Sequence, residues 1–160
     1  MLIIGAGLAG QRAALAAAQG GASVAIMSKV HPVRSHSVAA AGGMNAAIAL
    51  DDDWTEHAYD TVKGSDYLGD QDAIEIMCRE APDEVLWLEH QGVTFHRNPE
   101  GRLGTRAFGG ASAARTYYVA DITGQALLHV LYEQLMKVHA QVDRYEEWLD
   151  RKSTRLNSSH

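Results

Sequence analysis

The chain has 160 residues, of which 46% are hydrophobic and 21% are charged, so it has the length and composition of one ordinary globular domain with its own core. Its formal net charge of −6 argues against a general nucleic-acid-binding protein. The one cysteine, Cys78, excludes an internal disulfide and a cysteine-ligated metal cluster, and no apolar run approaches the roughly 20 residues that a membrane-spanning helix needs.

The start of the chain predicts a β-α-β unit. The apolar run Leu2–Ile4 is typical of the end of a buried parallel strand. Residues 11–19 are alanine-rich and favour a helix, which Gly20 and Gly21 end. Residues 23–27 predict a second strand, and we expect the two strands to pair in parallel through a right-handed crossover. The predicted fold class is therefore α/β, with a Rossmann-like parallel sheet.

A long loop, several helices and a pair of short strands are predicted next. Residues 28–43 have no regular pattern, and a loop of this length is usually functional. Pro82 suits the first turn of a helix, and Thr123 suits a helix cap. The predicted elements are helices over 55–63, 72–81, 82–91 and 124–138, the last with Leu127, Leu128, Leu131 and Leu135 on one face, and strands within 93–108 joined by a turn at 98–101.

Three glycines between the first strand and the first helix form the pattern G-x-G-x-x-G. Gly5 permits a tight turn, Gly7 lets the backbone, with Ala6 beside it, approach a pyrophosphate, and Gly10 allows close packing of helix on strand. The amino terminus of the helix offers N–H groups and a positive dipole end to the phosphates. The motif therefore predicts that the chain binds a dinucleotide.

The glycine motif does not choose between NAD, NADP and FAD. An acidic residue that binds the ribose hydroxyls often follows the second strand of such a unit. This chain has Ser28 and Lys29 there, and a lysine is compatible with the extra phosphate of NADP.

Residues 28–44 read SKVHPVRSHSVAAAGGM. They resemble the flavinylation loop of the flavoprotein subunits of succinate dehydrogenase and fumarate reductase, whose pattern is S-K-x-x-P-x-R-S-H-[ST]-x-x-A-x-G-G. The resemblance continues through residues 59–73, 106–110, 114–116 and 123–129 in the family's order, and it covers almost all of residues 2–149. The chain is thus similar to the amino-terminal, FAD-binding part of that family.

The resemblance implies a set of cofactor-binding residues. His36 would bond covalently to the 8α-methyl carbon of FAD, since a neutral imidazole nitrogen is a competent nucleophile. Phe108 would approach a dicarboxylate near the flavin, with core packing as the alternative. No metal ligand is expected, because no carboxylate or cysteine cluster accompanies the histidines. The residues that would wrap the ribose, pyrophosphate and isoalloxazine are Ser28, Lys29, Arg34, Ser35, Ser37, Gly42 and Gly43.

The function that the resemblance implies is oxidation of succinate to fumarate, with electrons passing through FAD to an iron–sulfur subunit and a quinone. Membrane anchor subunits would place the complex on the cytoplasmic side of the inner cell membrane. The family's catalytic arginine and substrate-binding histidines lie in a later capping region, so no catalytic residue is expected within this chain. Whether the complete protein, of which this chain would be a part, favours succinate oxidation or fumarate reduction stays open.

Three other functions stay open at this point. One is a soluble relative such as L-aspartate oxidase or a fumarate reductase with non-covalent flavin, which lacks the flavinylated histidine, so that the sequence Arg34-Ser35-His36 discriminates against it. Another is an NADP-dependent dehydrogenase, supported by Lys29 alone. The last is a non-catalytic nucleotide-binding fragment.

The chain departs from the family pattern at Ala41, where many members have glutamine, and in the short segment 111–113. Residues 150–160 resemble the translation of a sequencing-adapter oligonucleotide, so we interpret residues 1–149 as a partial FAD-binding domain and 150–160 as an adapter-derived tail. A domain incomplete at its carboxyl terminus would leave a sheet edge unfilled and an apolar face open. We therefore expect weak folding and poor FAD retention.

Overall fold

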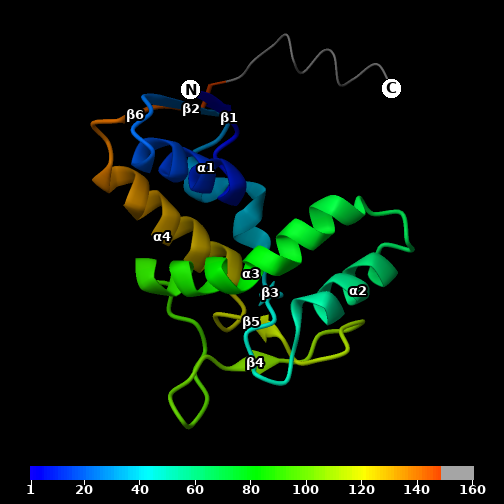
Figure 1. Ribbon diagram of the computed structural model, residues 1–160. Helices are drawn as coiled ribbons and strands as arrows, with labels where there is room; N and C mark the ends of the chain where they lie inside the picture. Colours follow the sequence, from blue (N-terminus) through cyan, green and yellow to red (C-terminus); the bar gives the residue numbers. More distant parts are fainter. Residues whose placement is uncertain (149–160) are drawn as a thin grey trace. The chain divides into compact units, whose positions relative to one another are not determined.

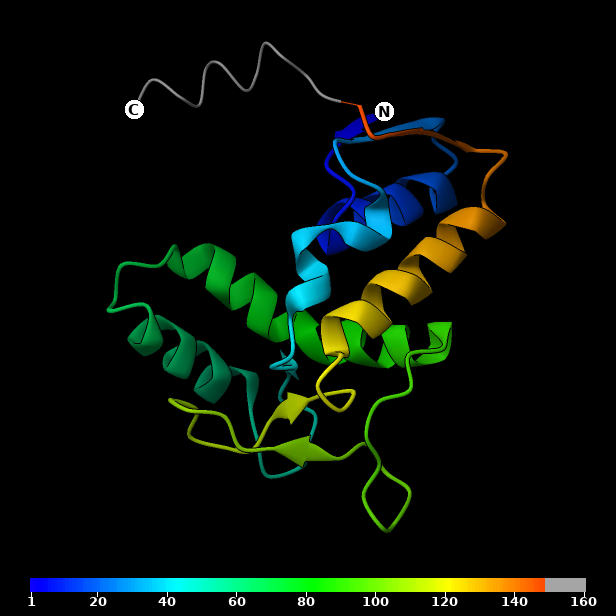
Figure 2. The same ribbon diagram turned by 180° about the vertical axis from the view of Figure 1, so that it is seen from behind.

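The computed structural model describes residues 1–148, which divide into two compact units (Figures 1 and 2). The first unit comprises residues 1–39 and the described residues from Leu127 on, and the second comprises residues 40–126. Each unit contains its own three-stranded sheet. Helix α4 (Thr123–Lys137) begins in the second unit and continues into the first.

The first unit contains the predicted β-α-β arrangement. Its parallel sheet has the order β1-β2-β6, from β1 (Leu2–Ile4), β2 (Val24–Ser28) and β6 (Val142–Glu146). The helix α1 (Leu8–Gln19) connects β1 to β2 and, like the carboxyl-terminal part of α4, lies on one side of the sheet (Figures 1 and 2). The predicted parallel pairing and α/β class are therefore confirmed.

The core of the first unit lies between the sheet and these two helices. The leucines that the sequence places on one face of α4 are all buried, which confirms that periodicity. Burying each such side chain contributes roughly 1.5–3 kcal/mol. The buried apolar residues of this unit include Ala14, Leu15, Ala18, Val24, Ile26, Leu127, Leu128, Leu131, Leu135 and Val142.

The prediction that Leu2–Ile4 is a buried strand is wrong in its burial. The side chains of Leu2 and Ile4 are 60% and 73% exposed. The strand β1 is at the edge of the sheet, and successive side chains of a strand point to opposite faces. Ile3 therefore faces the helices, and Leu2 and Ile4 face the opposite side. Two apolar side chains of this strand are therefore exposed in the described part of the chain.

The second unit combines a small antiparallel sheet with a helical hairpin. Its sheet has the order β3-β5-β4, from β3 (Met44–Asn45), β5 (Thr116–Tyr117) and β4 (Thr105–Arg106). The hairpin consists of α2 (Trp54–Gly64) packed against α3 (Gln71–Gln91).

Side-chain caps begin both helices of the hairpin. Asp53 accepts a hydrogen bond from the backbone N–H of Thr55 at 2.8 Å, and Asp70 accepts one from Ala73 at 3.2 Å. Gly92 ends α3 in the left-handed conformation, with φ of 114°, as its position in the sequence predicts.

The predicted helix boundary at Pro82 is wrong, because α3 runs through it without a break. Proline removes one helix hydrogen bond and crowds the preceding turn. On either side of it, Cys78, Val85 and Leu88 are buried on one face of the helix, and this packing offsets the local cost.

Three further expectations change in detail. The strands predicted within 93–108 shrink to an isolated bridge between Arg97 and Leu103 and to β4, while the turn is confirmed by the N–H of Gly101 donating to the carbonyl of Asn98 at 2.9 Å. Glycines interrupt the run and leave little side-chain pairing.

The long loop contains two short 3₁₀ helices, Pro32–Arg34 and His36–Ala39. The Thr123 hydroxyl accepts from the N–H of Val119 at 3.0 Å, so it closes the preceding turn.

None of the helices within residues 1–148 has both the length and the apolar character needed to cross a membrane. The tail that the sequence predicts, residues 150–160, lies outside the described residues.

The substitution Leu15→Ala is expected to lower the free energy of unfolding by about 2–5 kcal/mol, because it removes a fully buried side chain between α1 and the sheet. Urea unfolding followed by circular dichroism measures the change. Leu50→Ala, at a fully exposed leucine, is the control and should stay within about 0.5 kcal/mol of the parent. Equal effects of the two substitutions would contradict the core described here.

Candidate functional site

The glycine loop between β1 and α1 is held by two close backbone contacts. The N–H of Gly5 donates to the carbonyl of Met27 at 2.7 Å, and Gly5 has φ of 103°, which favours glycine. A Cβ on Gly10 would lie 1.9 Å from the carbonyl oxygen of Gly5. The third glycine of the motif therefore lets α1 begin directly against the end of β1, as the sequence predicts.

The loop brings Gly7 beside two serines of the later 3₁₀ segment. A Cβ on Gly7 would lie 3.3 Å from the Oγ of Ser37 and 3.6 Å from the Oγ of Ser35. Gly7 caps α1 without a side-chain hydrogen bond, and no acidic residue lies in the first turn of the helix. The Oγ of Ser35 is buried and has no partner among the described residues. A helix amino terminus, a small cradle and a buried unpaired hydroxyl are what a phosphate group needs.

Gln11 is a site residue that the motif did not reveal. Its side chain is fully buried, and its Nε2 donates to the carbonyl of Ala6 at 3.0 Å. This bond ties the first turn of α1 to the middle of the glycine loop. The Oε1 of Gln11 has no partner among the described residues. The sequence signal was weak, because glutamine is a common helix residue.

The end of β2 carries the two residues expected at the ribose. Ser28 is buried and donates from Oγ to the carbonyl of Val30 at 2.6 Å, while Lys29 is exposed. The backbone carbonyl of Ser28 also accepts from the N–H of Trp148 at 2.8 Å, after the end of β6. The carboxyl ends of two parallel strands therefore meet here, which is where α/β sheets bind ligands.

A polar cluster that sequence reasoning missed lies beside these strand ends. The hydroxyl of Tyr132 donates to Glu146 at 3.0 Å and accepts from Arg144 at 2.9 Å. The Nε2 of His31 lies 3.5 Å from the same carboxylate. The cluster ties the start of the long loop to β6 and α4. Arg34 and His36, further along the loop, are both exposed, so the imidazole of His36 is accessible for reaction.

The paired glycines and Phe108 lie together in the second unit. A Cβ on Gly42 would touch the Phe108 ring at 3.4 Å, and one on Gly43 would lie 2.6 Å from both the Thr116 side chain and the Tyr117 carbonyl. Gly43 also has φ of 116°. The Phe108 side chain is 51% exposed, which excludes simple core packing. A cavity of ≈ 120 Å³ is lined by Gly42, Gly43, Asn45, Phe108 and Thr116.

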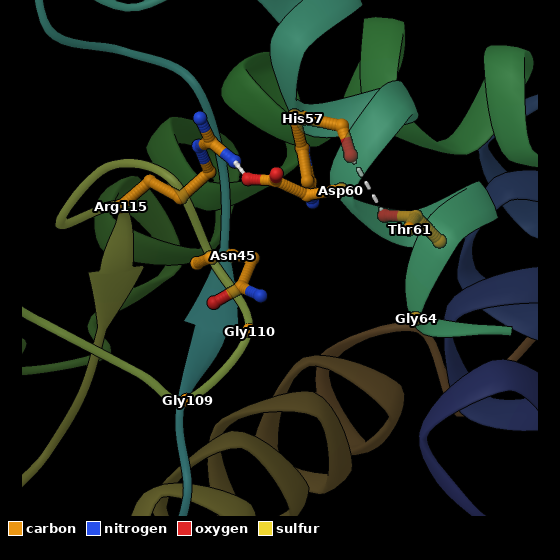
Figure 3. A pocket seen from close by; sticks show the side chains of 9 residues that line it. Asn45, His57, Asp60, Thr61, Gly64, Gly109, Gly110 and Arg115 are labelled. Atoms are coloured by element: carbon orange, nitrogen blue, oxygen red, sulfur yellow. Dashed lines mark hydrogen bonds and ion pairs between the residues drawn. The ribbon is translucent and has the colours of Figure 1, made fainter. Parts of the chain in front are cut away.

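A second cavity, also of ≈ 120 Å³, lies between α2 and the loop after Phe108 (Figure 3). Two of its lining residues, Asp60 and Arg115, belong to a buried ion network. Arg115 donates to both oxygens of Asp52 at 2.8 Å and to Asp60 at 2.5 Å. Asp60 also accepts from the N–H and hydroxyl of Ser112 at 2.7 and 2.8 Å. These contacts fix the loop that follows Phe108 onto α2.

The network controls the charge states of its members. The hydrogen bonds from Arg115 hold the pKa of Asp52 below its ordinary value, although burial opposes them. Burial raises the pKa of Asp60, but bonds from Ser112 and Arg115 outweigh it and leave that pKa lowered. Bonds to Asp52 in turn raise the pKa of Arg115. Burial lowers the pKa of His57, whose Nδ1 has no partner among the described residues, so this imidazole is neutral.

The structure therefore assembles the predicted residues in two groups. Gly5, Ala6, Gly7, Gly10, Ser28, Lys29, Arg34, Ser35, His36 and Ser37 belong to the first unit, and Gly42, Gly43 and Phe108 belong to the second. The first group suits a pyrophosphate and ribose, and its orphaned Ser35 hydroxyl fits the phosphate of a dinucleotide such as FAD. Within residues 1–148, no three His, Cys, Asp or Glu side chains are placed to hold a metal ion.

Comparisons with known proteins agree with this reading. Residues 1–151 match the family model FAD_binding_2, described as an FAD binding domain. The chain is 52% identical over 151 residues to the succinate dehydrogenase flavoprotein subunit of Rickettsia bellii, covering 88% of this chain and 25% of that one. It is 49% identical over 150 residues to the fumarate reductase flavoprotein subunit of Mycobacterium tuberculosis, covering 92% and 26%.

The fold also matches a solved structure of E. coli quinol fumarate reductase. The TM-score is 0.87 at 42% identity, covering 91% of this chain and 25% of that one. The chain thus spans about a quarter of the length of the relatives that it matches.

The substitution Gly7→Ala is expected to weaken FAD binding about tenfold, because the new methyl group would fill the cradle beside Ser35 and Ser37 and displace a phosphate hydrogen bond. Quenching of flavin fluorescence measures the dissociation constant. Gly64→Ala is the matched control, since a Cβ there meets open space. Unchanged affinity in Gly7→Ala, with the fold intact by circular dichroism, would contradict a phosphate site at this loop.

Stability is expected to fall as the pH is lowered, in two ranges. His57 has a lowered pKa in the folded state, so the unfolded chain binds more protons and stability drops as the pH falls below about 6.5. Asp52 also has a lowered pKa, so its contribution is present above about pH 4 and is lost as the pH falls through the folded value.

The substitution Asp52→Asn tests the same network, since it leaves the buried Arg115 short of a carboxylate and should cost about 3–5 kcal/mol at pH 7. Urea unfolding across pH 3–8 measures both effects. Asp51→Asn, at the exposed neighbouring residue, should keep the parent's stability and its pH dependence. A parent chain whose stability does not change below pH 6.5 would rule out a buried neutral His57.

Proposed function

Because this chain belongs to the family of FAD binding domains that its residues 1–151 match, we propose that it is the FAD-binding part of a succinate dehydrogenase or fumarate reductase flavoprotein. The single observation that carries the proposal is the identity of about half of its residues to flavoprotein subunits of both enzymes. These relatives are about four times as long as the matched region. The proposal therefore concerns the activity of a complete protein of which this chain would be a part.

The first unit supplies the phosphate and ribose contacts of this function. The N–H groups at the start of α1 and the hydroxyls of Ser35 and Ser37 would hold the pyrophosphate of FAD. Lys29 and the Ser28 backbone, at the carboxyl end of β2, would lie toward the ribose. Gln11 would keep the carbonyl of Ala6 turned into the protein and away from the phosphate.

His36 would attach the cofactor covalently. Its imidazole is exposed in a short 3₁₀ helix between Arg34 and the paired glycines. One of its ring nitrogens would be bonded to the 8α-methyl carbon of FAD in place of one C–H bond, and the flavin so held would supply the redox chemistry. A tethered flavin of raised potential suits hydride removal from an unactivated dicarboxylate.

The parent reaction would be the interconversion of succinate and fumarate. FAD supplies the redox chemistry, and the chain's own residues bind and orient it. Phe108, half exposed beside the glycine pair, would bound the dicarboxylate site. The parent would pass electrons to an iron–sulfur subunit and a quinone. Membrane anchor subunits would hold it at the cytoplasmic side of the inner membrane.

The expected product is a chain that keeps FAD after denaturation. When the parent protein containing this sequence is expressed, its flavin fluorescence should remain on a denaturing gel, and its mass should exceed that of the polypeptide by one FAD. The substitution His36→Ser should abolish both signals, while His139→Ser, at an exposed histidine after α4, should retain them.

Flavin that binds but dissociates on denaturation of the unsubstituted protein would favour the alternative, a soluble relative with non-covalent FAD such as L-aspartate oxidase. Absence of any flavin would favour a non-catalytic nucleotide-binding fragment.

A further inference from the structure

Arg106 makes an unusual set of contacts within the second unit. Its Nε donates to the carbonyl of Gly42 at 3.2 Å, and its Nη2 donates to the carbonyls of Ala41, at 2.7 Å, and Gly42. The guanidinium also lies over the ring of Tyr118, 4.3 Å from the centroid. The rigid, planar guanidinium thus joins Arg106 to Gly42 and Ala41, which lie 64 and 65 positions earlier in the chain.

These contacts determine where the neighbouring N–H groups point. A trans peptide is planar, with its C=O and N–H on opposite sides, and the chain has no cis peptide among its described residues. The carbonyls of Ala41 and Gly42 both face Arg106. The N–H groups in the same two peptides belong to Gly42 and Gly43, so both point away from Arg106.

The turn that carries this donor pair is fixed on its other side. Gly43 has φ of 116° and packs so closely on β5 that a Cβ would overlap Thr116 and Tyr117. The cavity next to the turn is lined by Gly42, Gly43 and Phe108, among others, and Arg106 does not line it. The two donors are therefore presented on the cavity side of the turn, and the guanidinium stands behind them.

The positive charge of Arg106 has no carboxylate partner in the described part of the chain. Within residues 1–148 Arg106 forms no ion pair with a carboxylate, whereas Arg115, nine positions later, is paired with two. A positive charge that donates hydrogen bonds to both carbonyls polarises the two peptides in the same sense and strengthens their N–H groups as donors. The turn is thus suited to an anionic acceptor.

We propose that Arg106 is a positioning residue that makes the Ala41–Gly43 turn an electropositive pair of donors for the reduced isoalloxazine ring of FAD. This inference rests on the proposed function and on the resemblance, which implies that the glycine pair contacts the flavin. The reduced ring carries negative charge and the oxidised ring does not, so Arg106 favours the reduced form and raises the reduction potential of the cofactor.

Two substitutions separate the charge from the hydrogen bonds. Arg106→Gln keeps a donor and removes the charge, while Arg106→Lys keeps the charge and loses the planar fork. The control is Arg102→Gln, which removes an exposed guanidinium from the turn before β4. The dissociation constants of oxidised and reduced FAD are measured for each 160-residue chain, by fluorescence quenching in air and by absorbance titration without oxygen.

Arg106→Gln should weaken binding of reduced FAD about tenfold more than binding of oxidised FAD, as expected for unit charges roughly 10 Å apart near a protein surface. That ratio corresponds to a fall of about 30 mV in the two-electron potential. Arg106→Lys and Arg102→Gln should keep the wild-type ratio. A purely structural role would weaken both forms equally and leave the ratio unchanged.

Equal weakening of the two forms by a folded Arg106→Gln would overturn the proposal. Should circular dichroism show that this variant is unfolded, Arg106→Met is measured in its place, because it also removes the charge: a ratio equal to that of the wild-type chain would overturn the proposal, and a tenfold change of the ratio would support it. If a folded wild-type chain binds neither form of FAD, the proposed function fails and this inference fails with it, whereas binding with an unaltered ratio in Arg106→Gln defeats this inference alone.

Discussion

The approach of Gly10 to the carbonyl of Gly5 is the contact on which the first unit depends. Only a residue without a Cβ leaves room there, and as a result the first turn of α1 follows the end of β1 with almost no connecting chain. The amino terminus of α1, at Gly7, therefore lies beside Ser35 and Ser37 of the later loop. Gln11 then holds the loop backbone from inside the helix. The phosphate site that we propose depends on this packing.

The second unit is organised by a buried charge. Arg115 lies between Asp52 and Asp60, and its bonds join the residues before α2, the second turn of α2 and the loop before β5. Such networks add little net stability, because removing the charges from water is costly. Their value is geometric, since few other arrangements satisfy so many donors and acceptors. Here the geometry that they hold is that of the segment just after Phe108.

The residues predicted to bind the cofactor occur in both units. The first contains those proposed for phosphate and ribose, and the second contains the glycine turn and Phe108. His36 and the paired glycines come from one continuous segment that passes from the first unit into the second.

The sequence by itself determined the features that depend on near neighbours. The β-α-β unit, the roles of Gly5 and Gly10, the turn at Asn98–Gly101 and the buried leucine face of α4 all follow from residues a few positions apart, where backbone freedom and helical period decide the outcome. The resemblance of the long loop to a flavinylation loop also needed the order of the residues alone.

Only the tertiary structure decided which distant groups meet. The exposure of Leu2 and Ile4 depends on the position of β1 in the sheet, and the continuity of α3 through Pro82 depends on packing on both sides of it. The unpaired hydroxyl of Ser35 beside Gly7, and the contact of Arg106 with Ala41 and Gly42, join segments that are far apart in the chain. Local preference sets the conformation of a segment, but which segments come together is decided by the burial and pairing energy of the whole chain, and no short pattern contains that energy.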